Sequence, residues 1–308
     1  MKAVHSRFLK LLQGEKQFRI PIYQRTYDWE TENCQQLLDD IIKVANDENR
    51  PTHFFGSIVY MEPEITNQTD VDQLLVIDGQ QRLTTIALLL FVIYQIFLER
   101  PNPDPENVLS RIKTLYLINP DVDKNKKYKL ILTKSDTETL NNIIAGTPNT
   151  GESAQNITKN LKFFKKSIED NDLDIEMLYA GLRKLNIVDL SLEKDSDNPQ
   201  LIFESLNSTG LKLTEADKIR NFLLMGLDTV EQNDLYEKFW YPMERNLLGP
   251  SNRSKLFDRF MKDYLTIKQT TIPAQDKVYF KFKEYHRDEN MSNAEYVKDL
   301  HYYSEFFE

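Results

Sequence analysis

The sequence predicts an α+β protein, in which a small unit of alternating strands and helices is followed by a mostly helical region. In the first hundred residues, short runs of β-branched and aromatic residues alternate with segments of helical spacing. Three prolines within residues 101–105 end this pattern, and apolar residues then recur mainly at helical spacing. We therefore expect an α/β unit at residues 1–100, a helical part with one returning strand at 101–225, and a helical extension at 226–308.

Each element follows from a local pattern. A strand is predicted at residues 17–23, because the residue before Pro21 favours extended backbone. Further strands are predicted at residues 53–60, 73–78 and 185–192, where apolar and β-branched residues cluster or alternate. Helices are predicted near residues 29–46, 80–99, 105–117, 136–145, 153–169, 172–182, 198–206, 214–225, 231–246, 252–267, 274–287 and 292–306.

Several predicted helices begin with capping residues. Asp28 is expected to cap the helix near residues 29–46. Thr214 and Asp217 nearly match a capping box, and Ser292 with Glu295 matches one fully.

Composition limits the class of protein. A length of 308 residues, of which 40% are hydrophobic, is enough for two folded domains. The single cysteine, Cys34, excludes an internal disulfide and a cysteine-rich zinc site, and we expect it to be buried on a helix. The N-terminus lacks the apolar core of a signal peptide, and the longest apolar run, residues 86–98, is shorter than the roughly 18–20 residues that span a bilayer. We expect a soluble cytoplasmic protein.

Charge argues against a surface devoted to nucleic acid. The net charge is −9, although residues 124–129 and 159–166 form two basic clusters with interleaved aromatic residues. Such clusters are usually solvated faces, and contact with nucleic acid is the alternative interpretation.

The strongest local signal for a binding site is the junction between the strand at 73–78 and the helix at 80–99. The chain reads Gln73-Leu-Leu-Val-Ile-Asp-Gly-Gln-Gln-Arg-Leu-Thr-Thr-Ile86, so that polar residues occupy the first helical turns. A helix N-terminus favours an anion, glycine allows close approach to the backbone, and arginine can clamp a phosphate. The alternative is structural: Asp78 caps the helix and Arg82 neutralises an acidic neighbour.

Two more polar clusters interrupt apolar elements. The first, in residues 20–29, offers side chains suited to stacking, hydrogen bonding or anion binding, namely Tyr23, Gln24, Arg25, Tyr27 and Trp29. The second, in residues 203–217, contains Asn207 and Asp217. The structural alternatives are aromatic residues that complete the core and an acid at Asp217 that caps its helix.

Four motifs occur in one order, and together they resemble a known family. They are Ile20-Pro-x-Tyr-Gln-Arg-x-Tyr-x-Trp29, His53-Phe-x-Gly-Ser-Ile58, Ile77-Asp-Gly-Gln-Gln-Arg-Leu-Thr-Thr85 and Phe203-x-x-x-Asn-x-x-Gly-x-x-Leu-x-x-x-Asp217. Over about residues 5–225 the chain resembles the N-terminal domain of GmrSD-type restriction enzymes, which are modification-dependent. The resemblance implies a ParB/sulfiredoxin-like mixed sheet with helices, and an Asp-Gly-Gln-Gln-Arg motif that binds and hydrolyses nucleoside triphosphates coupled to DNA cleavage.

Carried over residue by residue, the resemblance implies a nucleotide site. Phosphoryl transfer requires mainly positioning and charge neutralisation. The implied catalytic residues are Asp78, Gln80, Gln81 and Arg82, with Mg²⁺ held by Asp78 directly or through water. The implied nucleotide-binding residues are Tyr23, Gln24, Arg25, Gly79, Arg82, Thr84, Thr85, Asn207 and Asp217. The sequence has no Gly-x-x-x-x-Gly-Lys-Ser/Thr motif, which excludes a conventional P-loop.

The chain departs from the family in its histidines. Full-length members commonly carry an HNH-type nuclease domain, but this sequence has only His5, His53, His286 and His301, without metal-ligand spacing. We expect either a fragment that ends before the nuclease or a shorter member that relies on a partner.

Three hypotheses remain open. The first is a regulatory domain that binds, and hydrolyses, a nucleoside triphosphate in a bacterial antiphage defence system acting on modified DNA. The second is a recognition module for modified DNA that does not hydrolyse nucleotide. The third is a ParB-like nuclease in its own right. The expected partners are a nucleotide, DNA and a nuclease domain or subunit, with no membrane and with oligomers possible.

Overall fold

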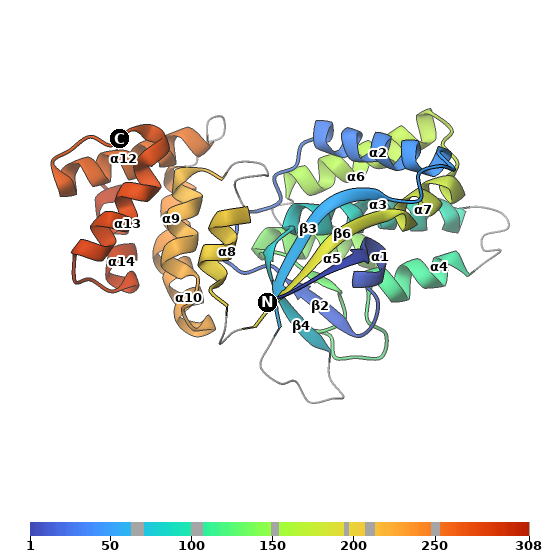
Figure 1. Ribbon diagram of the computed structural model, residues 1–308, viewed down its shortest axis with the longest axis horizontal. Helices are drawn as coiled ribbons and strands as arrows, with labels where there is room; N and C mark the ends of the chain where they lie inside the picture. Colours follow the sequence, from blue (N-terminus) through green and yellow to red (C-terminus); the bar gives the residue numbers. More distant parts are fainter. Residues whose placement is uncertain are drawn as a thin grey trace. The chain divides into compact units, whose positions relative to one another are not determined.

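The computed structural model describes residues 1–62, 71–99, 107–148, 154–193, 197–206, 213–247 and 253–307. The chain divides into two compact units (Figure 1), which are described separately. Unit 1 comprises Met1–Pro21 and Thr26–Asn198, and unit 2 comprises Ile22–Arg25 and Pro199–Glu308. The α+β class is confirmed, since a mixed sheet is combined with many helices. The ParB/sulfiredoxin-like fold stays a prediction.

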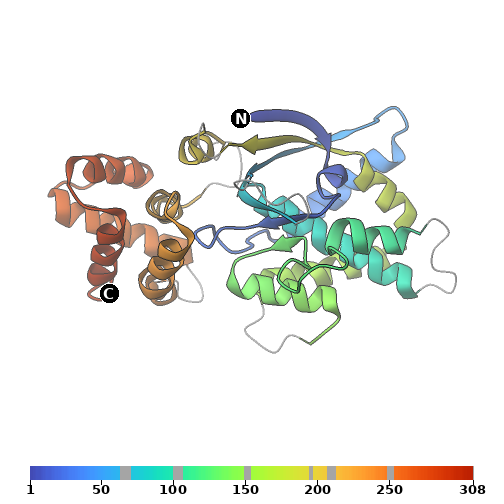
Figure 2. The same ribbon diagram turned by 90° about the horizontal axis from the view of Figure 1, so that it is seen from below.

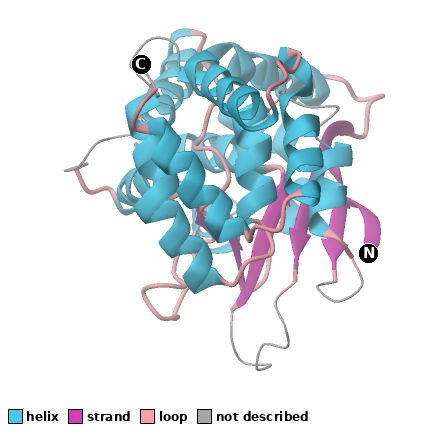
Figure 3. Cartoon of the chain, turned by 90° about the vertical axis from the view of Figure 1, so that its left-hand side faces the viewer, coloured by secondary structure: helices cyan, strands magenta, loops and turns pink. Residues whose placement is uncertain are grey.

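Unit 1 contains a six-stranded sheet in the order β1-β6-β3-β4-β2-β5, whose strands lie as neighbours in Figure 3. The pairs β1–β6 and β3–β4 are antiparallel, and the pairs β3–β6, β2–β4 and β2–β5 are parallel. The strands are β1 (Lys2–Arg7), β2 (Lys16–Arg19), β3 (His53–Met61), β4 (Asp72–Asp78), β5 (Leu130–Ile131) and β6 (Leu185–Leu192).

The helices of unit 1 pack with this sheet around one apolar core. The central helix is α3, in which the stretch from Ile86 to Ile93 is buried throughout. The helices are α1 (Phe8–Leu11), α2 (Thr31–Asn46), α3 (Gln80–Glu99), α4 (Val108–Arg111), the π-helix η1 (Ile112–Leu117), α5 (Lys134–Ala145), α6 (Gln155–Asp170) and α7 (Ile175–Arg183).

The helix α3 is also, by length and composition, the one described helix apolar enough to cross a membrane. In the folded chain 67% of its most apolar stretch is buried inside the protein. This burial is typical of the core helix of a folded domain.

Unit 2 is helical. Its core is rich in aromatic residues, among them Trp240, Tyr264 and Tyr296, and Tyr23 from the short segment Ile22–Arg25 is buried in the same core. The helices are α8 (Pro199–Leu206), α9 (Glu215–Leu224), α10 (Thr229–Leu235), the π-helix η2 (Tyr236–Trp240), α11 (Tyr241–Leu247), α12 (Arg253–Gln269), the 3₁₀ turn η3 (Gln275–Lys277), α13 (Val278–Asp288) and α14 (Asn293–Ser304).

Several predicted boundaries agree with the structure. The helix at 80–99 and the strand at 185–192 are found with the same bounds, and the capping boxes Thr214/Asp217 and Ser292/Glu295 both form. Cys34 is fully buried on α2, as expected. The predicted helix at 105–117 is observed from residue 108 as α4 and η1, and residues 105 and 106 lie outside the described range.

Other predictions needed correction. The strand predicted at 17–23 ends at Arg19, because the short segment Ile22–Arg25 belongs to unit 2. The helix predicted from 29 begins at Thr31, and Glu30 rather than Asp28 caps it, in a reciprocal pair with Asn33. The prediction omitted β1, α1 and β5.

Apart from the segment Ile22–Arg25, the chain passes from unit 1 to unit 2 between residues 198 and 199, whereas the sequence suggested divisions at residues 100 and 225. Residues 101–198 belong to the same compact unit as the sheet, because two of the sheet's strands, β5 and β6, come from this part of the chain. The division of the chain into family domain and extension stays a prediction.

The close packing of α7 on α2 leads to a testable prediction about Gly181. A Cβ atom on Gly181 would lie 2.6 Å from the carbonyl oxygen of Ile41 and 3.1 Å from the Cβ atom of Ala45. Alanine favours a helix over glycine by about 1 kcal/mol, but overpacking against backbone costs typically about 1–3 kcal/mol. We expect Gly181→Ala to lower the thermal unfolding midpoint. A raised midpoint, measured by circular dichroism, would show that α2 and α7 separate easily.

Candidate functional site

The predicted junction between strand and helix is present in unit 1. Strand β4 ends at Asp78, Gly79 makes the turn with φ +101°, and α3 begins at Gln80. A Cβ atom on Gly79 would lie 2.4 Å from the Ile58 Cδ1 atom and 3.1 Å from the Ser57 carbonyl oxygen. Glycine is therefore required here for backbone conformation and for close approach to β3.

A second glycine holds the motif arginine. Gly56 has φ +103°, and a Cβ atom on it would lie 2.8 Å from the Arg82 Nε atom. The Arg82 Nη1 atom donates to the Ser57 carbonyl oxygen at 3.1 Å and lies 3.6 Å from the Asp78 Oδ2 atom. The side chains of Asp78 and Arg82 are each 26% exposed. The guanidinium is thus held by the backbone of β3, in a side chain that is only partly buried.

Sequence reasoning did not name Gly56 and Ser57 as site residues. They lie in the motif His53-Phe-x-Gly-Ser-Ile58, which it used only for the family resemblance. The pairing of β3 with β6 shifts register between Phe54 and Ser57, at this glycine. A lone glycine inside a strand pattern is the signal that predicts such a bulge or close backbone approach.

Gln81 connects the junction to the loop of residues 26–29. Its Oε1 atom accepts hydrogen bonds from the backbone N–H groups of Asp28 and Trp29, at 2.9 and 3.3 Å. Its Nε2 atom donates to the Thr26 carbonyl oxygen at 3.4 Å. The amide of Gln81 is therefore used to hold this loop, and the neighbouring Gln80 is buried.

The two threonines of the motif are also buried. The hydroxyl of Thr84 donates to the Gln80 carbonyl oxygen at 3.0 Å, and that of Thr85 donates to the Gln81 carbonyl oxygen at 2.8 Å. The Thr85 hydroxyl also lies 2.7 Å from the Tyr27 hydroxyl. Both threonine hydroxyls are thus engaged inside the protein, and their role in nucleotide binding stays a prediction.

Tyr27 is the centre of a buried polar network. Its hydroxyl accepts from the Asn160 amide at 3.1 Å, and the same amide donates to the Trp29 carbonyl oxygen at 2.6 Å. The Tyr27 backbone N–H group donates to the Asp136 carboxylate at 2.6 Å. The structural interpretation of Tyr27 as a core residue is therefore supported.

Burial makes Asp136 an unusual acid. Its desolvation raises the pKa from 3.8 to about 6, and the hydrogen bond from the Tyr27 backbone acts in the opposite direction. The folded chain therefore holds this proton more tightly than the unfolded chain does.

The remaining predicted residues belong to unit 2. Tyr23 is 1% exposed and lies in the aromatic core, and Gln24 is buried beside it in sequence. The role of Arg25 at the same nucleotide as Asp78 and Arg82 concerns residues of both units and stays a prediction. Asn207 lies outside the described residues.

Both carboxylate oxygens of Asp217 have hydrogen-bond partners within its own helix and cap. One carboxylate oxygen accepts from the Thr214 backbone N–H group at 3.3 Å, and the other accepts from Arg220 at 2.9 Å. Arg220 is buried and also contacts Glu244, whose charge and that of Asp217 keep its pKa raised against the effect of burial. Helix capping and this ion pair account for Asp217, so its role at a nucleotide stays a prediction.

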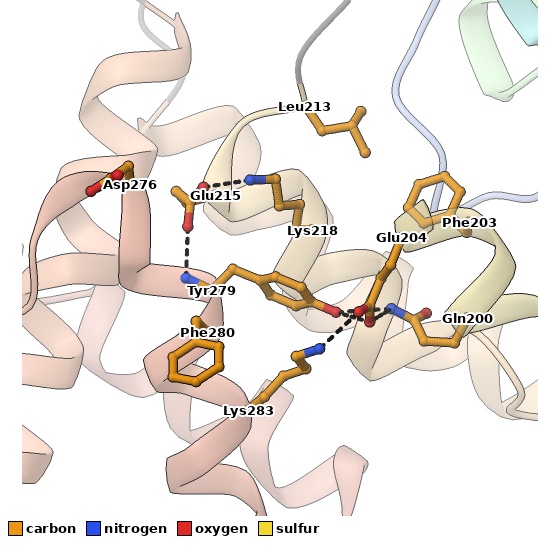
Figure 4. A pocket seen from close by; sticks show the side chains of 10 residues that line it. All are labelled: Gln200, Phe203, Glu204, Leu213, Glu215, Lys218, Asp276, Tyr279, Phe280 and Lys283. Atoms are coloured by element: carbon orange, nitrogen blue, oxygen red, sulfur yellow. Dashed lines mark hydrogen bonds and ion pairs between the residues drawn. The ribbon is translucent and has the colours of Figure 1, made fainter. Parts of the chain in front are cut away.

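Residues of the polar cluster at 203–217 border a cavity of about 500 Å³ in unit 2 (Figure 4). Lys283 donates to Glu204 at 2.7 Å, and Lys218 donates to Glu215 at 2.6 Å. The hydroxyl of Tyr279 also donates to Glu204. With Asp276, the described lining residues include three acids and two lysines, and this excess of negative charge disfavours phosphate.

The described residues of the junction do not by themselves form a magnesium site. Among the described residues, no three His, Cys, Asp or Glu side chains come close enough to hold a metal ion. Mg²⁺ is commonly held by one or two carboxylates together with substrate phosphates. Asp78 could supply one such carboxylate, and the other ligands would have to be phosphate oxygens and water.

The fold and the junction define a class of protein: an α+β domain whose polar helix start is fixed on a neighbouring strand by glycine and arginine. The particular family follows from comparison, since the model of the N-terminal domain of GmrSD restriction endonuclease matches residues 8–224. The chain belongs to this family. No curated protein sequence matches the chain.

Alanine substitutions at the two glycines of the junction, Gly56 and Gly79, form a matched pair of variants. Gly56 and Gly79 have nearly equal φ angles, so alanine is strained at both. At Gly79 a Cβ atom would meet the buried Ile58 side chain at 2.4 Å and also the Ser57 carbonyl oxygen at 3.1 Å, whereas at Gly56 its three nearest atoms all belong to the flexible Arg82 side chain. We expect Gly79→Ala to destabilise the chain more, by about 1–3 kcal/mol beyond Gly56→Ala, in urea unfolding. Equal losses would contradict this account of Gly79.

The raised pKa of Asp136 predicts a pH dependence. Between about pH 4 and 6 the folded chain binds more protons than the unfolded chain, so its stability falls as pH rises through this window. We expect Asp136→Asn to remove this fall, which amounts to at most about 3 kcal/mol, and to be more stable than the parent above pH 6. Urea unfolding at several pH values measures it. The exposed change Asp170→Asn is the control, and an unchanged slope in Asp136→Asn would contradict the prediction.

Proposed function

We propose that the chain is the nucleotide-binding regulatory domain of a restriction system that acts on modified DNA. One observation carries this proposal: Arg82 is held by Gly56 and Ser57 at the start of a 20-residue helix, and its side chain is only partly buried. The family to which the chain belongs, the N-terminal domain of a restriction endonuclease, supports the same proposal.

The chemistry of the junction suits phosphate. Backbone N–H groups at a helix start and the positive end of the helix dipole favour an anion. A guanidinium held in one place loses less conformational entropy when it forms paired hydrogen bonds to phosphate oxygens. The exposed faces of Asp78 and Arg82 are therefore where we place the phosphates.

The motif residues then have distinct roles. Arg82 neutralises charge on the phosphates, and Asp78 would hold Mg²⁺ together with phosphate oxygens, so that the metal supplies further charge neutralisation. Gln81, whose amide holds residues 26–29, transmits the state of the junction to that loop. Coupling to DNA cleavage requires a nuclease domain or subunit.

Substitution of Arg82 tests the proposal. Arg82→Ala removes the fixed guanidinium, and we expect nucleotide affinity, measured by calorimetry with Mg²⁺ present, to fall at least about tenfold. Arg19→Ala, which removes an exposed arginine from β2, should leave affinity unchanged. Undiminished nucleotide binding in Arg82→Ala, with a normal circular dichroism spectrum, would rule out this site.

One observation favours the second candidate function, a recognition module that does not hydrolyse nucleotide. Gln80 is buried and Gln81 is engaged by the loop, so neither glutamine presents a side chain ready to orient water. Release of phosphate from a nucleoside triphosphate by the isolated chain distinguishes the two functions. Salt-dependent binding of modified DNA without phosphate release would favour the recognition module.

A further inference from the structure

A cavity in unit 1 concentrates positive charge. Its volume is about 530 Å³, and of the nine described residues that line it five are basic and none is acidic. The basic residues are Arg7, Lys10, Arg111, Arg183 and Lys184. The chain as a whole has a net charge of −9, so the positive charge of this cavity is opposite in sign to the net charge of the chain.

Three separate stretches of the chain build this cavity. They are the end of β1 with α1, the α4–η1 segment, and the end of α7, which lie side by side in Figures 1 and 2. We call it the α1/α4/α7 cavity. It contains none of the residues of the Asp-Gly-Gln-Gln-Arg motif.

Two of the basic residues form hydrogen bonds to backbone carbonyl oxygens. Arg7 donates to the carbonyl oxygens of Pro51 and Lys184, at 3.1 and 2.9 Å. The ammonium group of Lys184 donates to the carbonyl oxygens of Val44 and Asp47, at 2.8 and 3.2 Å. Backbone carbonyls carry no net charge, so both lining residues keep their positive charge.

The other three, Lys10, Arg111 and Arg183, are exposed. None of the five basic residues forms an ion pair with another described residue. Burial raises the pKa of Tyr179, and the positive charges of Arg111 and Arg183 both oppose this rise, which shows that the two guanidinium groups lie within electrostatic range of one hydroxyl. Like charges brought together in this way repel unless an anion lies between them.

We propose that the α1/α4/α7 cavity binds the phosphate backbone of double-stranded DNA, with Arg111 and Arg183 as the main contacts. Arginine pairs with phosphate oxygens through two parallel hydrogen bonds. The one aromatic residue of the lining, Tyr116, is 4% exposed, so the cavity offers charge rather than a stacking surface for bases. Contacts of this kind position DNA without reading its sequence.

This inference deepens the proposed function and rests on it for the choice of DNA as the polyanion. It adds a place where the chain holds the duplex, separate from the residues to which we assign the nucleotide. The cavity in unit 2 has a similar volume but an excess of acids, and it is unsuited to the same ligand.

The test compares two pairs of substitutions that remove the same charge from the full chain. The first pair is Arg111→Gln with Arg183→Gln, in the cavity. The second is Lys124→Gln with Lys127→Gln, on an exposed basic segment of the same unit. Fluorescence anisotropy of a labelled short DNA duplex is measured between about 50 and 200 mM salt, where phosphate contacts dominate the change in affinity.

We expect the cavity pair to weaken DNA binding by roughly tenfold or more and to reduce the salt slope by about 1 for each lost contact. The Lys124/Lys127 pair should change neither quantity as much. The double change to lysine, Arg111→Lys with Arg183→Lys, keeps both charges and should retain most of the salt slope. Circular dichroism verifies that each variant is folded.

Three outcomes would overturn the inference. Equal effects of the two glutamine pairs would show that only overall charge matters. Unchanged DNA binding in the cavity pair, with weakened binding of inorganic triphosphate, would assign the cavity to a small anion. Absence of DNA binding by the parent chain at low salt would show that DNA is not the ligand of this cavity. Nucleotide binding by Arg82→Ala is measured separately, so failure of the proposed nucleotide site is distinguishable from failure of this cavity.

Discussion

The contact between Arg82 and the backbone of β3 is the constraint on which unit 1 depends at its polar end. Two glycines, Gly56 and Gly79, adopt left-handed backbone conformations, and in each case another residue fills the space that a side chain would take. Ile58 packs over Gly79, and Arg82 packs over Gly56. The strand β3, the end of β4 and the start of α3 are therefore fixed together by close contact, and a charged side chain is placed at a defined position without being buried.

This arrangement also explains why two motifs distant in the sequence belong together. The glycine in residues 53–58 makes room for the arginine in residues 77–85, and the Ser57 carbonyl oxygen gives that arginine a hydrogen-bond acceptor. The loop of residues 26–29 joins the same assembly through Gln81 and Tyr27. These segments therefore contact one another directly, through the close approach at Gly56 and Gly79 and through the hydrogen bonds of Gln81 and Tyr27.

Much of the fold was predictable because strong local patterns decide it. The helix at 80–99 and the strand at 185–192 are long or regular enough that no tertiary contact overrides them. The strand β1 was not predictable, because most of its residues are exposed and only pairing with β6 defines it. Asp217 shows the same limit in the site: one sequence pattern fits a ligand contact and a helix cap, and the structure gives it the partners of a cap. The α1/α4/α7 cavity was invisible in the sequence, because the arginines at positions 7, 111 and 183 come together only through tertiary packing.

The short segment Ile22–Arg25 has a practical consequence for dissecting the protein. It comes from the N-terminal part of the sequence, yet Tyr23 is buried in the aromatic core of unit 2. A fragment that begins at Pro199 would contain every helix of unit 2 and would still lack one of its core side chains. The void left by a buried aromatic residue typically destabilises a domain by about 3–5 kcal/mol, which is a large part of the stability of most domains. The helical unit is therefore discontinuous in the gene, and a linear cut between the units does not separate two complete folding units.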